Sequence, residues 1–565
     1  MLPRIGAPPL ERAEIYFLDA ARGMVESGDW LVPRYQGEPF FDKPILCYWL
    51  MAASMKAFGA TALAARLVPA LAAIGVLFAT ALLGRLLYDR RTGLAGALVL
   101  ATTFAFLSFA RVAMSDMLLS LWTTLAVALG VLAYRARPSA WVLPALGATL
   151  GLGFATKGPI ALLVAGVALA LVAWRQRARP LPWGSGRLSL AAAAFVLPGL
   201  GWFALVHARL GWEPLAYFFL RENVQRFAGE AYDVGRPFWF YPPAYLAQGL
   251  PWSPLLPLAL WRLLRARGDS CTLAATRLLA AWVALVLVPL SLSRGKIDYY
   301  LLPLYPALSL LLGRFLAGKP WQRLDRAWAR CVLLTGALAA AALAARPLPL
   351  PEPWLPGPLP RALFAAVLAA VVLGLLAAAW RPTPARVLGA LAASAAAIFL
   401  LLSAFFLPAF AAAQPNRAIA RDVGRERRFE PRARLVYCAD PSRARRDVLF
   451  EARHEAVEQC DLWAYAASRE PWLLLVTPAQ ETAFKVLPGW RRIARYPYLP
   501  ASALTFDGLA GGPRAGEVVL GANFATSDPE AERRRKRDYR KAIQKDLATE
   551  AALTGPSPAA ASPAP

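Results

Sequence analysis

The sequence carries little charge for its length. Only 17% of its 565 residues are charged and 58% are hydrophobic, whereas soluble globular proteins are about a quarter charged. It also lacks grouped metal ligands, because its five cysteines are scattered, with no CxxC pair and no Cys/His cluster. We therefore predict no zinc site. Cys438 and Cys460 form a disulfide in an oxidising compartment, or remain two free thiols.

Sequence signals of other protein classes are missing too. Residues 1–20 contain no apolar signal-peptide segment. There is no P-loop and no Rossmann glycine fingerprint, and no internal repeat is visible. A net charge of +26 is typical of nucleic-acid binding, but the arginines lie in short loops between apolar segments. The positive-inside rule explains that placement, so we expect no nucleic-acid partner.

Long apolar runs dominate instead, and each is long enough to cross a hydrocarbon core of about 30 Å. The segment 139–174 is too long for one crossing, so we divide it at Thr156-Lys157-Gly158-Pro159. The fold class is therefore an all-α polytopic membrane bundle with about twelve spans. These are expected near 65–86, 92–110, 114–134, 139–155, 158–174, 188–207, 244–264, 272–293, 299–317, 328–345, 361–380 and 387–408.

Lysines and arginines are concentrated in alternate loops. Six loops on one side contain 19 of them, which indicates that this side faces the cytoplasm. Residues 1–64, the turns near Arg111 and Lys157, the loop 208–243, the turn 294–298 and everything after 408 then lie outside. The outer segments hold the acidic and aromatic clusters together with cations that topology does not explain. A bound anion at the outer face would explain those cations.

Five polar clusters therefore meet at the predicted outer face. A carboxylate is suited to general acid–base work and a fixed cation to phosphate binding, although single clusters also fit an interfacial helix, a snorkelling lysine or an aromatic belt. An acid at the start of a span is costly, which makes Asp116 a functional candidate unless it merely pairs with Arg111. The clusters contain Glu11, Glu14, Asp19, Asp42 and Lys43, then Arg111 and Asp116, then Lys157, then Arg226, and finally Lys296, Tyr299 and Tyr300.

These clusters resemble a known family. The stretches ESGDWLVPRYQGEPFFDKP (26–44), ATKGP (155–159), QRFAGE with PFWFY (225–241) and SRGKIDYYLLPLYP (293–306), with the element ending at Asp116, occur in order across more than half of the chain. They are similar to bacterial glycosyltransferases related to protein O-mannosyltransferases and lipid A aminoarabinose transferases, in the GT-C superfamily. The resemblance is specific to the superfamily and not to a substrate.

The resemblance implies a GT-C bundle with juxtamembrane helices and a C-terminal extracytoplasmic domain. It implies a polyprenyl-phosphate-linked sugar donor and a glycolipid, polysaccharide or protein acceptor, with transfer at the outer face of the bacterial inner membrane. Glu14 and Asp116 are the predicted catalytic carboxylates. Secondary candidates are Glu11, Asp42, Arg111, Tyr299 and Tyr300. Lys43, Lys157, Arg226 and Lys296 are predicted to bind the donor phosphate.

The chain departs from the family at three places. Relatives usually carry an Asp-Glu pair in the first loop, where this chain has Ala13-Glu14, so Glu14 is the candidate acid with Glu11 or Asp19 as substitutes. Asn223 stands where aminoarabinose transferases tend to carry a histidine, so no metal ligand is predicted, although a divalent cofactor is left open. The usual first membrane helix is missing, through a late start codon or a real difference of the subgroup.

Four regions are expected: an outer catalytic loop at 1–64, the bundle at 65–408, a small α/β domain at 409–528 and a charged helix with a Pro/Ala tail at 529–565. A transporter or flippase is the main alternative function, since transporters also carry charges within the membrane. Transporters usually contain internal repeats and broken mid-membrane helices. A structural scaffold would not explain outward-facing lysines beside acids.

Overall fold

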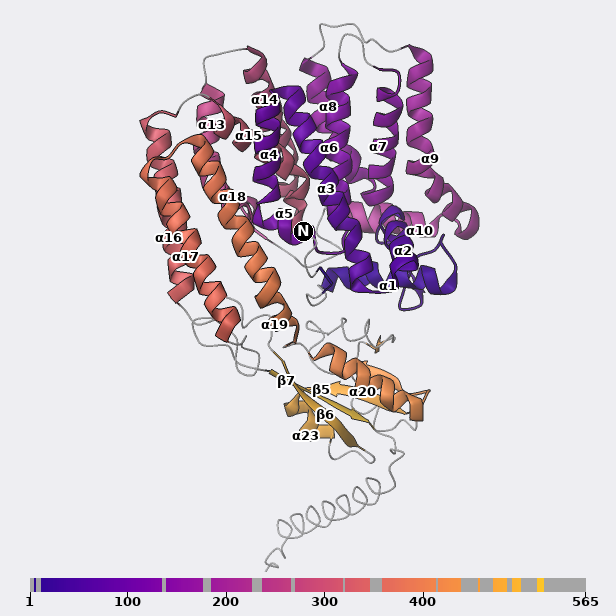
Figure 1. The fold of residues 1–565 in the computed structure, drawn as a ribbon. Coiled ribbons are helices and arrows are strands. Elements are labelled where there is room, and N and C mark those ends of the chain that lie inside the picture. The colour runs from indigo at the N-terminus through magenta and orange to yellow at the C-terminus, as the bar shows by residue number, and fades with distance from the viewer. Residues whose placement is uncertain are drawn as a thin grey trace, which may run out of the picture. The chain divides into compact units, whose positions relative to one another are not determined.

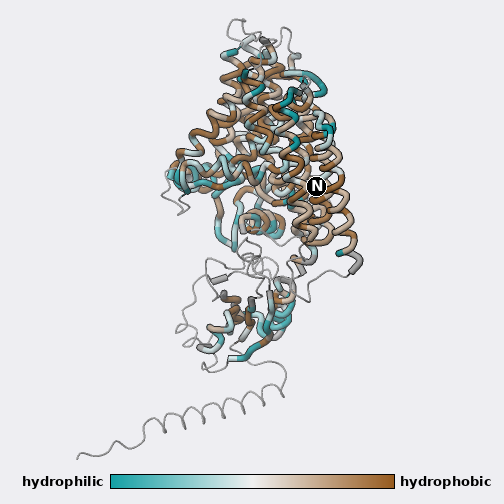
Figure 2. Tube along the Cα trace, turned by 90° about the vertical axis from the view of Figure 1, so that its left-hand side faces the viewer, coloured by the Kyte–Doolittle hydropathy of each residue, from teal (hydrophilic) through white to brown (hydrophobic). Residues whose placement is uncertain are grey.

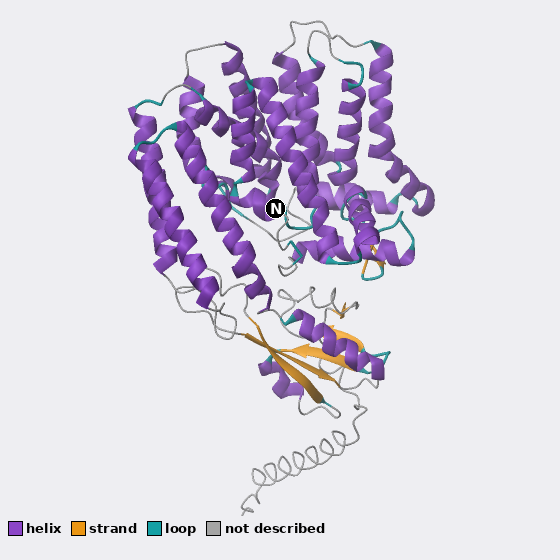
Figure 3. Ribbon diagram, in the orientation of Figure 1, coloured by secondary structure: helices purple, strands orange, loops and turns teal. Residues whose placement is uncertain are grey.

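The structure is a computed structural model, and contacts divide it into a unit at Met1–Ala412 and a unit at Ala413–Pro565. The first unit is almost entirely helical, whereas most of the strands belong to the second (Figure 3). The described residues are 5–6, 12–134, 139–175, 184–225, 236–265, 270–318, 321–345, 358–412, 415–437, 456–457, 471–484, 490–498 and 516–522.

Two helices precede the first span and pack on each other. Helix α1 (Arg12–Ser27) buries one face, which includes Leu18 and Met24, whereas its last residues are exposed. A hairpin of β1 (Arg34–Tyr35) and β2 (Glu38–Pro39) links it to α2 (Leu46–Phe58). Both helices lie at the lower end of the bundle in Figure 1, as expected for juxtamembrane helices.

Small residues allow the first bundle helices to pack closely. Helix α3 (Ala62–Leu87), α4 (Arg90–Ala101) and α15 (Tyr305–Ala317) contact one another. A Cβ on Gly93 would lie 2.3 Å from the backbone oxygen of Ala81, and one on Gly313 would lie 2.5 Å from the backbone nitrogen of Gly96. Glycine is needed at these crossings because the backbones approach too closely for a side chain, as in many membrane helix pairs.

Four antiparallel helices follow, and their ends define one face of the bundle. They are α6 (Asp116–Ala133), α7 (Val142–Lys157), α8 (Pro159–Arg175) and α9 (Ser185–Leu210). The predicted division of 139–174 at Lys157-Gly158 is confirmed. Gly158 adopts φ 66° and Pro159 begins α8, because glycine tolerates positive φ and proline suits the first turn of a helix.

Two predicted spans are broken, and the two breaks contact each other. The segment 92–110 divides into α4 and α5 (Phe104–Phe109), and 244–264 divides into α12 (Tyr241–Gln248), η2 (Ser253–Leu255) and α13 (Leu256–Arg265). Phe104 N donates to the Leu250 oxygen at 2.9 Å, and Trp252 Nε1 donates to Thr102 Oγ1 at 3.1 Å. Each break thus provides hydrogen-bond partners for backbone and side-chain groups of the other. Polar groups in an apolar environment need such partners.

The remaining elements complete the first unit. After α9 come α10 (Glu213–Ala216) and the π-helix η1 (Tyr217–Gln225), and later α14 (Ser270–Leu292), the 3₁₀ helix η3 (Asp298–Leu304), α16 (Arg323–Ala345), α17 (Pro358–Trp380), α18 (Pro384–Leu401), η4 (Leu402–Phe406) and α19 (Leu407–Ala412). Hydrophobic residues extend along the bundle helices (Figure 2).

Membrane class is confirmed, but the number of spans is not. Within the described residues, eight helices are long and apolar enough to cross a membrane, and α7 and α8 are shorter apolar helices. Four of the twelve predicted spans are not among these eight: α7 and α8 have only 16 and 17 residues, and the two broken segments lack a continuous helix of sufficient length. The apolar segments alone do not reveal such breaks.

The second unit contains a mixed five-stranded sheet. The strand order is β4 (Ala456–Val457), β3 (Arg434–Tyr437), β5 (Trp472–Val476), β7 (Gly516–Ala522) and β6 (Arg491–Tyr498). Strand β3 is parallel to β4 and β5, whereas β7 is antiparallel to β5 and β6. The sequence predicts strands at 434–438, 472–477 and 492–498 and a helix at 478–488 within this region. The three strands are confirmed as β3, β5 and β6, and α23 (Pro478–Phe484) occupies part of the predicted helix.

Alternate residues of the sheet form two apolar cores. Leu473 and Leu475 face α20 (Asn416–Phe429), whose Ile419 and Val423 pack against them. Leu474 belongs to the other core, with Trp490 partly buried beside it. The predicted α/β character of this region is confirmed. Cys438, Cys460 and the predicted charged helix and tail at 529–565 lie outside the described residues.

Candidate functional site

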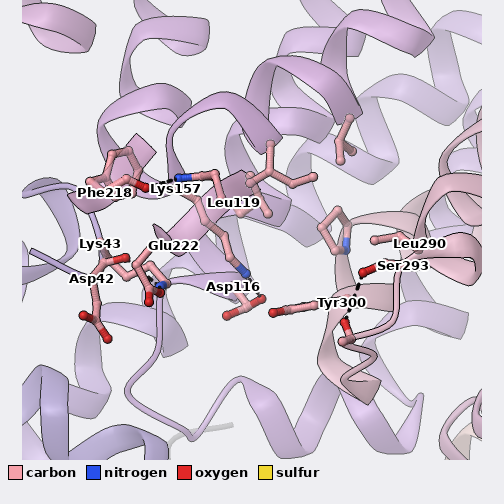
Figure 4. A pocket seen from close by; sticks show the side chains of 15 residues that line it. Asp42, Lys43, Asp116, Leu119, Lys157, Phe218, Glu222, Leu290, Ser293 and Tyr300 are labelled. Atoms are coloured by element: carbon pink, nitrogen blue, oxygen red, sulfur yellow. Dashed lines mark hydrogen bonds and ion pairs between the residues drawn. The ribbon is translucent and has the colours of Figure 1, made fainter. Parts of the chain in front are cut away.

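A cavity with five charged residues in its lining lies where several elements of the first unit meet. Its volume is about 130 Å³. Four of its charged lining residues come from separate segments: a loop before α2, the start of α6, the end of α7, and η1 (Figure 4). The lining consists of Asp42, Lys43, Asp116, Leu119, Lys157, Ile160, Val164, Phe218, Glu222, Asn223, Leu290, Ser293, Gly295, Tyr300 and Pro303.

One side of the cavity holds an ion pair between two helix ends. Lys157 Nζ lies in direct contact with Asp116 Oδ1, and both side chains are largely buried. Asp116 begins α6 and Lys157 ends α7, so each charge has the sign that its helix dipole favours. The prediction that an outward cation and an acid meet at these two turns agrees with this geometry.

Two tyrosine rings of the 3₁₀ helix η3 lie beside the Lys157–Asp116 pair. Lys157 Nζ lies 5.0 Å from the ring centre of Tyr300 and 5.8 Å from that of Tyr299. Both distances suit cation–π contacts. The Tyr300 side chain points toward Asp116 in Figure 4, and Tyr299 packs edge-on against it. Lys157 is thus held by a carboxylate and two aromatic rings.

The other side holds a second ion pair. Lys43 Nζ lies 3.1 Å from Glu222 Oε2 and also donates to the Asp42 backbone oxygen at 2.6 Å. The Glu222 side chain is completely buried, whereas 20% of the Lys43 side chain is exposed. A buried carboxylate needs such a partner, since an isolated charge in an apolar site is costly. Lys43 is therefore the more accessible member of this ion pair.

Asp42 accepts a hydrogen bond from a phenol. Tyr217 donates its hydroxyl hydrogen bond to Asp42 Oδ1 at 3.0 Å. Burial, and then the negative charge of Asp42, raise the pKa of Tyr217 to about 12. The phenol therefore remains protonated at neutral pH and keeps donating to the carboxylate.

The π-helix η1 aligns Phe218, Glu222 and Asn223 with the cavity. Asn223 Nδ2 donates to the Phe218 oxygen at 2.7 Å, which ties one turn together. A Cβ on Gly158 would lie 2.6 Å from Phe218 Cζ, so the turn after Lys157 fits against this helix because residue 158 lacks a side chain. π-Helical turns are rare and often occur at functional sites.

Glu14 occupies a different position from the one expected. It is fully buried and does not line the cavity, as far as the described residues show. Its two oxygens accept from Arg66 Nε at 2.8 Å and Arg66 NH2 at 2.7 Å, and Oε1 also accepts from Ala113 N at 2.7 Å. Glu14 therefore binds the loop that precedes Asp116. Asp19, the substitute, accepts from Arg22 and from Gln36 N.

Two further predicted cations are buried in structural contacts. Lys296 donates to the backbone oxygens of Arg236, at 3.0 Å, and Ser293. Arg111 donates to the Ser403 hydroxyl, and its guanidinium lies 5.3 Å from the Phe399 ring. Neither appears in the described lining of the cavity. Lys296 instead stabilises the loop that brings Ser293 and Gly295 to the cavity.

Two other predicted site residues, Arg226 and Glu11, lie outside the described residues. Within the part of the chain that is described, no group of three or more His, Cys, Asp or Glu side chains is arranged to hold a metal ion. Glu222 and Tyr217 were not among the predicted site residues, because glutamate and tyrosine near a membrane boundary are common and their burial is visible only in three dimensions.

Comparisons with known proteins agree with this fold. Residues 10–210 match the family described as dolichyl-phosphate-mannose-protein mannosyltransferase. The chain is 37% identical over 310 residues to the undecaprenyl phosphate-alpha-4-amino-4-deoxy-L-arabinose arabinosyl transferase of Pseudomonas aeruginosa (strain UCBPP-PA14), covering 54% of this chain and 55% of the relative. A Sodalis glossinidius (strain morsitans) enzyme of the same description, numbered 1, is 35% identical, covering 58% and 61%.

The chain shares the fold of ArnT from Cupriavidus metallidurans. The crystal structure of that protein bound to undecaprenyl phosphate has a TM-score of 0.69 and 21% identity, covering 92% of this chain and 95% of the other; its apo structure gives the same values. The predicted resemblance and the GT-C fold are therefore confirmed, and the protein is a multi-pass membrane protein. By sequence, the chain spans about half the length of the curated relatives it matches.

Proposed function

We propose that this chain transfers a sugar from a polyprenyl-phosphate donor to an acceptor hydroxyl or amine. The observation that carries the proposal is the cavity with two lysine–carboxylate pairs, Lys43–Glu222 and Lys157–Asp116. Relatives aligned over more than half of the chain are described as undecaprenyl phosphate aminoarabinose transferases. That description supports a lipid-phosphate donor.

In the proposed reaction, the two lysines bind the donor phosphate. The bond between the anomeric carbon and the phosphate oxygen breaks, and its electron pair leaves with the polyprenyl phosphate. Negative charge grows on that phosphate in the transition state, so Lys43 and Lys157 stabilise the transition state more than the bound donor. Tyr300, beside Lys157 in the cavity, lies where it would contact the phosphate or the first lipid units.

Asp116 is the proposed general base. Before the donor binds, its charge is neutralised by Lys157. A phosphate that attracts Lys157 removes this counter-ion, which makes the carboxylate a stronger proton acceptor. The acceptor then loses its proton to Asp116 as its oxygen or nitrogen bonds to the anomeric carbon. Asp42, held by Tyr217, is placed to orient the sugar or the acceptor.

Glu14 acts as a positioning residue in this proposal. Its hydrogen bond from Ala113 N holds the loop three residues before Asp116. Residues 13 and 14 therefore supply a structural glutamate without the aspartate that relatives usually carry. The sequence predicts that Glu14 or Asp116 is the general base, and in this proposal Asp116 has that role.

The orientation is proposed from the distribution of cations. The loops rich in lysine and arginine are at the other ends of the helices that carry Asp116 and Lys157, and the positive-inside rule assigns those loops to the cytoplasm. The cavity would then open on the outer side of the bacterial inner membrane. The C-terminal unit would be extracytoplasmic as well.

The test uses membranes that contain the protein and labelled polyprenyl-phosphate sugars. Label is expected to appear in a glycolipid fraction, and Lys157→Met is expected to reduce the rate by roughly 10²–10³-fold, as removal of one charge-stabilising donor does elsewhere. Arg262→Met is the control, because Arg262 pairs with Asp325 at 2.7 Å away from the cavity lining. Movement of intact donor across the bilayer without sugar transfer would instead support a flippase.

A further inference from the structure

Helix α20 of the second unit presents an arginine-rich outer face. Arg421, Arg425 and Arg428 recur at helical spacing on one side and are all exposed, with Gly424 exposed among them. The opposite side packs Ile419 and Val423 into the sheet core. The helix is therefore anchored by its apolar side, and its cations have a fixed direction.

Local acids neutralise only part of this face. Asp422 lies 3.3 Å from Arg425, but it also accepts a hydrogen bond from Tyr496. Glu426 is buried and pairs with Arg491 of β6. Both carboxylates of α20 thus contact β6 and also lie near Arg425, at 3.3 Å and 4.0 Å, while the side chains of Arg421, Arg425 and Arg428 remain exposed.

The chain connection limits how far the start of this helix can lie from the last candidate span. The last candidate span ends at Phe406, and the apolar helix α19 continues to Ala412. Helix α20 begins at Asn416, and four Cα–Cα steps reach at most about 15 Å. The positive-inside rule gives no reason for arginines on the outer side, whereas lipid phosphates would.

We propose that Arg421, Arg425 and Arg428 dock α20 on the anionic headgroups of the bilayer. Guanidinium groups bind phosphate oxygens in a bidentate manner. Each cation near an anionic surface strengthens binding by about fivefold, so three give on the order of a hundredfold. Docking would fix the second unit near the membrane surface without involving the sugar-transfer cavity.

The test uses the full chain in lipid nanodiscs with a nitroxide label at Gly424→Cys and the five native cysteines replaced. A Cβ at residue 424 meets nothing within 4 Å, so the label has room. In phosphatidylcholine alone, the label is expected to collide mainly with a water-soluble relaxation agent. With phosphatidylglycerol added, its collisions with oxygen are expected to increase, and high salt is expected to reverse the change.

Variants then separate charge from folding. The triple change to glutamine at residues 421, 425 and 428 is expected to abolish the lipid-dependent shift, and the triple change to lysine to keep it. Equal accessibility in both lipids, or a shift that survives in the glutamine variant, would overturn the proposal. Inorganic phosphate provides a second arm: if it immobilises the label in phosphatidylcholine discs, the face binds soluble phosphate groups rather than the membrane.

Discussion

Replacing Lys43 by methionine separates the structural role of its ion pair from its role in transfer. The Lys43–Glu222 pair spans 3.1 Å, and Glu222 is completely buried. At an effective dielectric constant of about 20, this attraction amounts to about 5 kcal/mol. Loss of one partner of a buried pair typically costs about 3–5 kcal/mol. Lys43→Met is therefore expected to be less heat-stable and, because the phosphate loses a cation, roughly 10²–10³-fold slower.

The double variant Lys43→Met/Glu222→Gln distinguishes these two losses. Removing both charges leaves no buried carboxylate without a counter-ion, so thermal stability is expected to recover most of the way to wild type. The transfer rate per folded molecule is expected to remain as low as in the single variant. Glu222→Gln alone keeps the cation and frees it from its carboxylate, so it is expected to lower the KM for the lipid donor.

The assay combines thermal unfolding in detergent with initial rates of transfer from a labelled lipid-linked sugar. Arg262→Met supplies the matched control, because it breaks the comparable Arg262–Asp325 pair outside the cavity lining. This control is expected to lose stability but not turnover per folded molecule. Recovery of both stability and full transfer in the double variant would refute the assignment of Lys43 to the phosphate.

Three other predictions concern the base, the buried glutamate and the helix crossing. Asp116→Asn is expected to lower kcat by about 10²-fold or more while lowering the donor KM, because Lys157 is no longer neutralised; a raised KM would contradict this. Glu14→Gln is expected to reduce thermal stability because Arg66 is left buried with one ionic partner fewer. Adding Arg66→Met to the same chain is expected to restore much of that stability. A Glu14→Gln variant that is stable but inactive would return the base role to Glu14. Gly93→Ala is expected to cost about 1–3 kcal/mol through overpacking, measured as a lower unfolding temperature, whereas Gly166→Ala, which meets nothing within 4 Å, is expected to be neutral.

The sequence predicts the membrane bundle and the strands of the C-terminal unit because both depend on local apolar patterns. It predicts Lys43, Asp116 and Lys157 for a different reason: a charge at the mouth of an apolar helix has few explanations. It does not predict the breaks at Thr102 and near Trp252, since these depend on contacts between distant helices. It also does not predict that Glu222 rather than Glu14 faces the cavity, because burial and pairing are set by tertiary structure.

Glu14 illustrates the limit most clearly. Its distance along the sequence from the loop around residue 30 matched the position of a family carboxylate, and its type was suited to acid–base work. The structure instead gives both of its oxygens to Arg66 and one also to Ala113 N. These contacts of the buried carboxylate therefore favour a structural role, which the Glu14→Gln variant tests.

The charges at the cavity also bear on the net charge of the cavity during the proposed sugar transfer. In the proposed reaction, the phosphate gains one negative charge when the sugar leaves, and Asp116 loses one when it takes the proton of the acceptor. The net charge of the cavity is therefore unchanged, and Lys157 exchanges a carboxylate partner for a phosphate partner within the same small space. Because no charge enters or leaves a region of low dielectric constant, the step avoids the large desolvation cost that an uncompensated charge would carry. In this proposal, Asp116 is released from Lys157 only while a donor phosphate is present, so proton removal is coupled to donor binding.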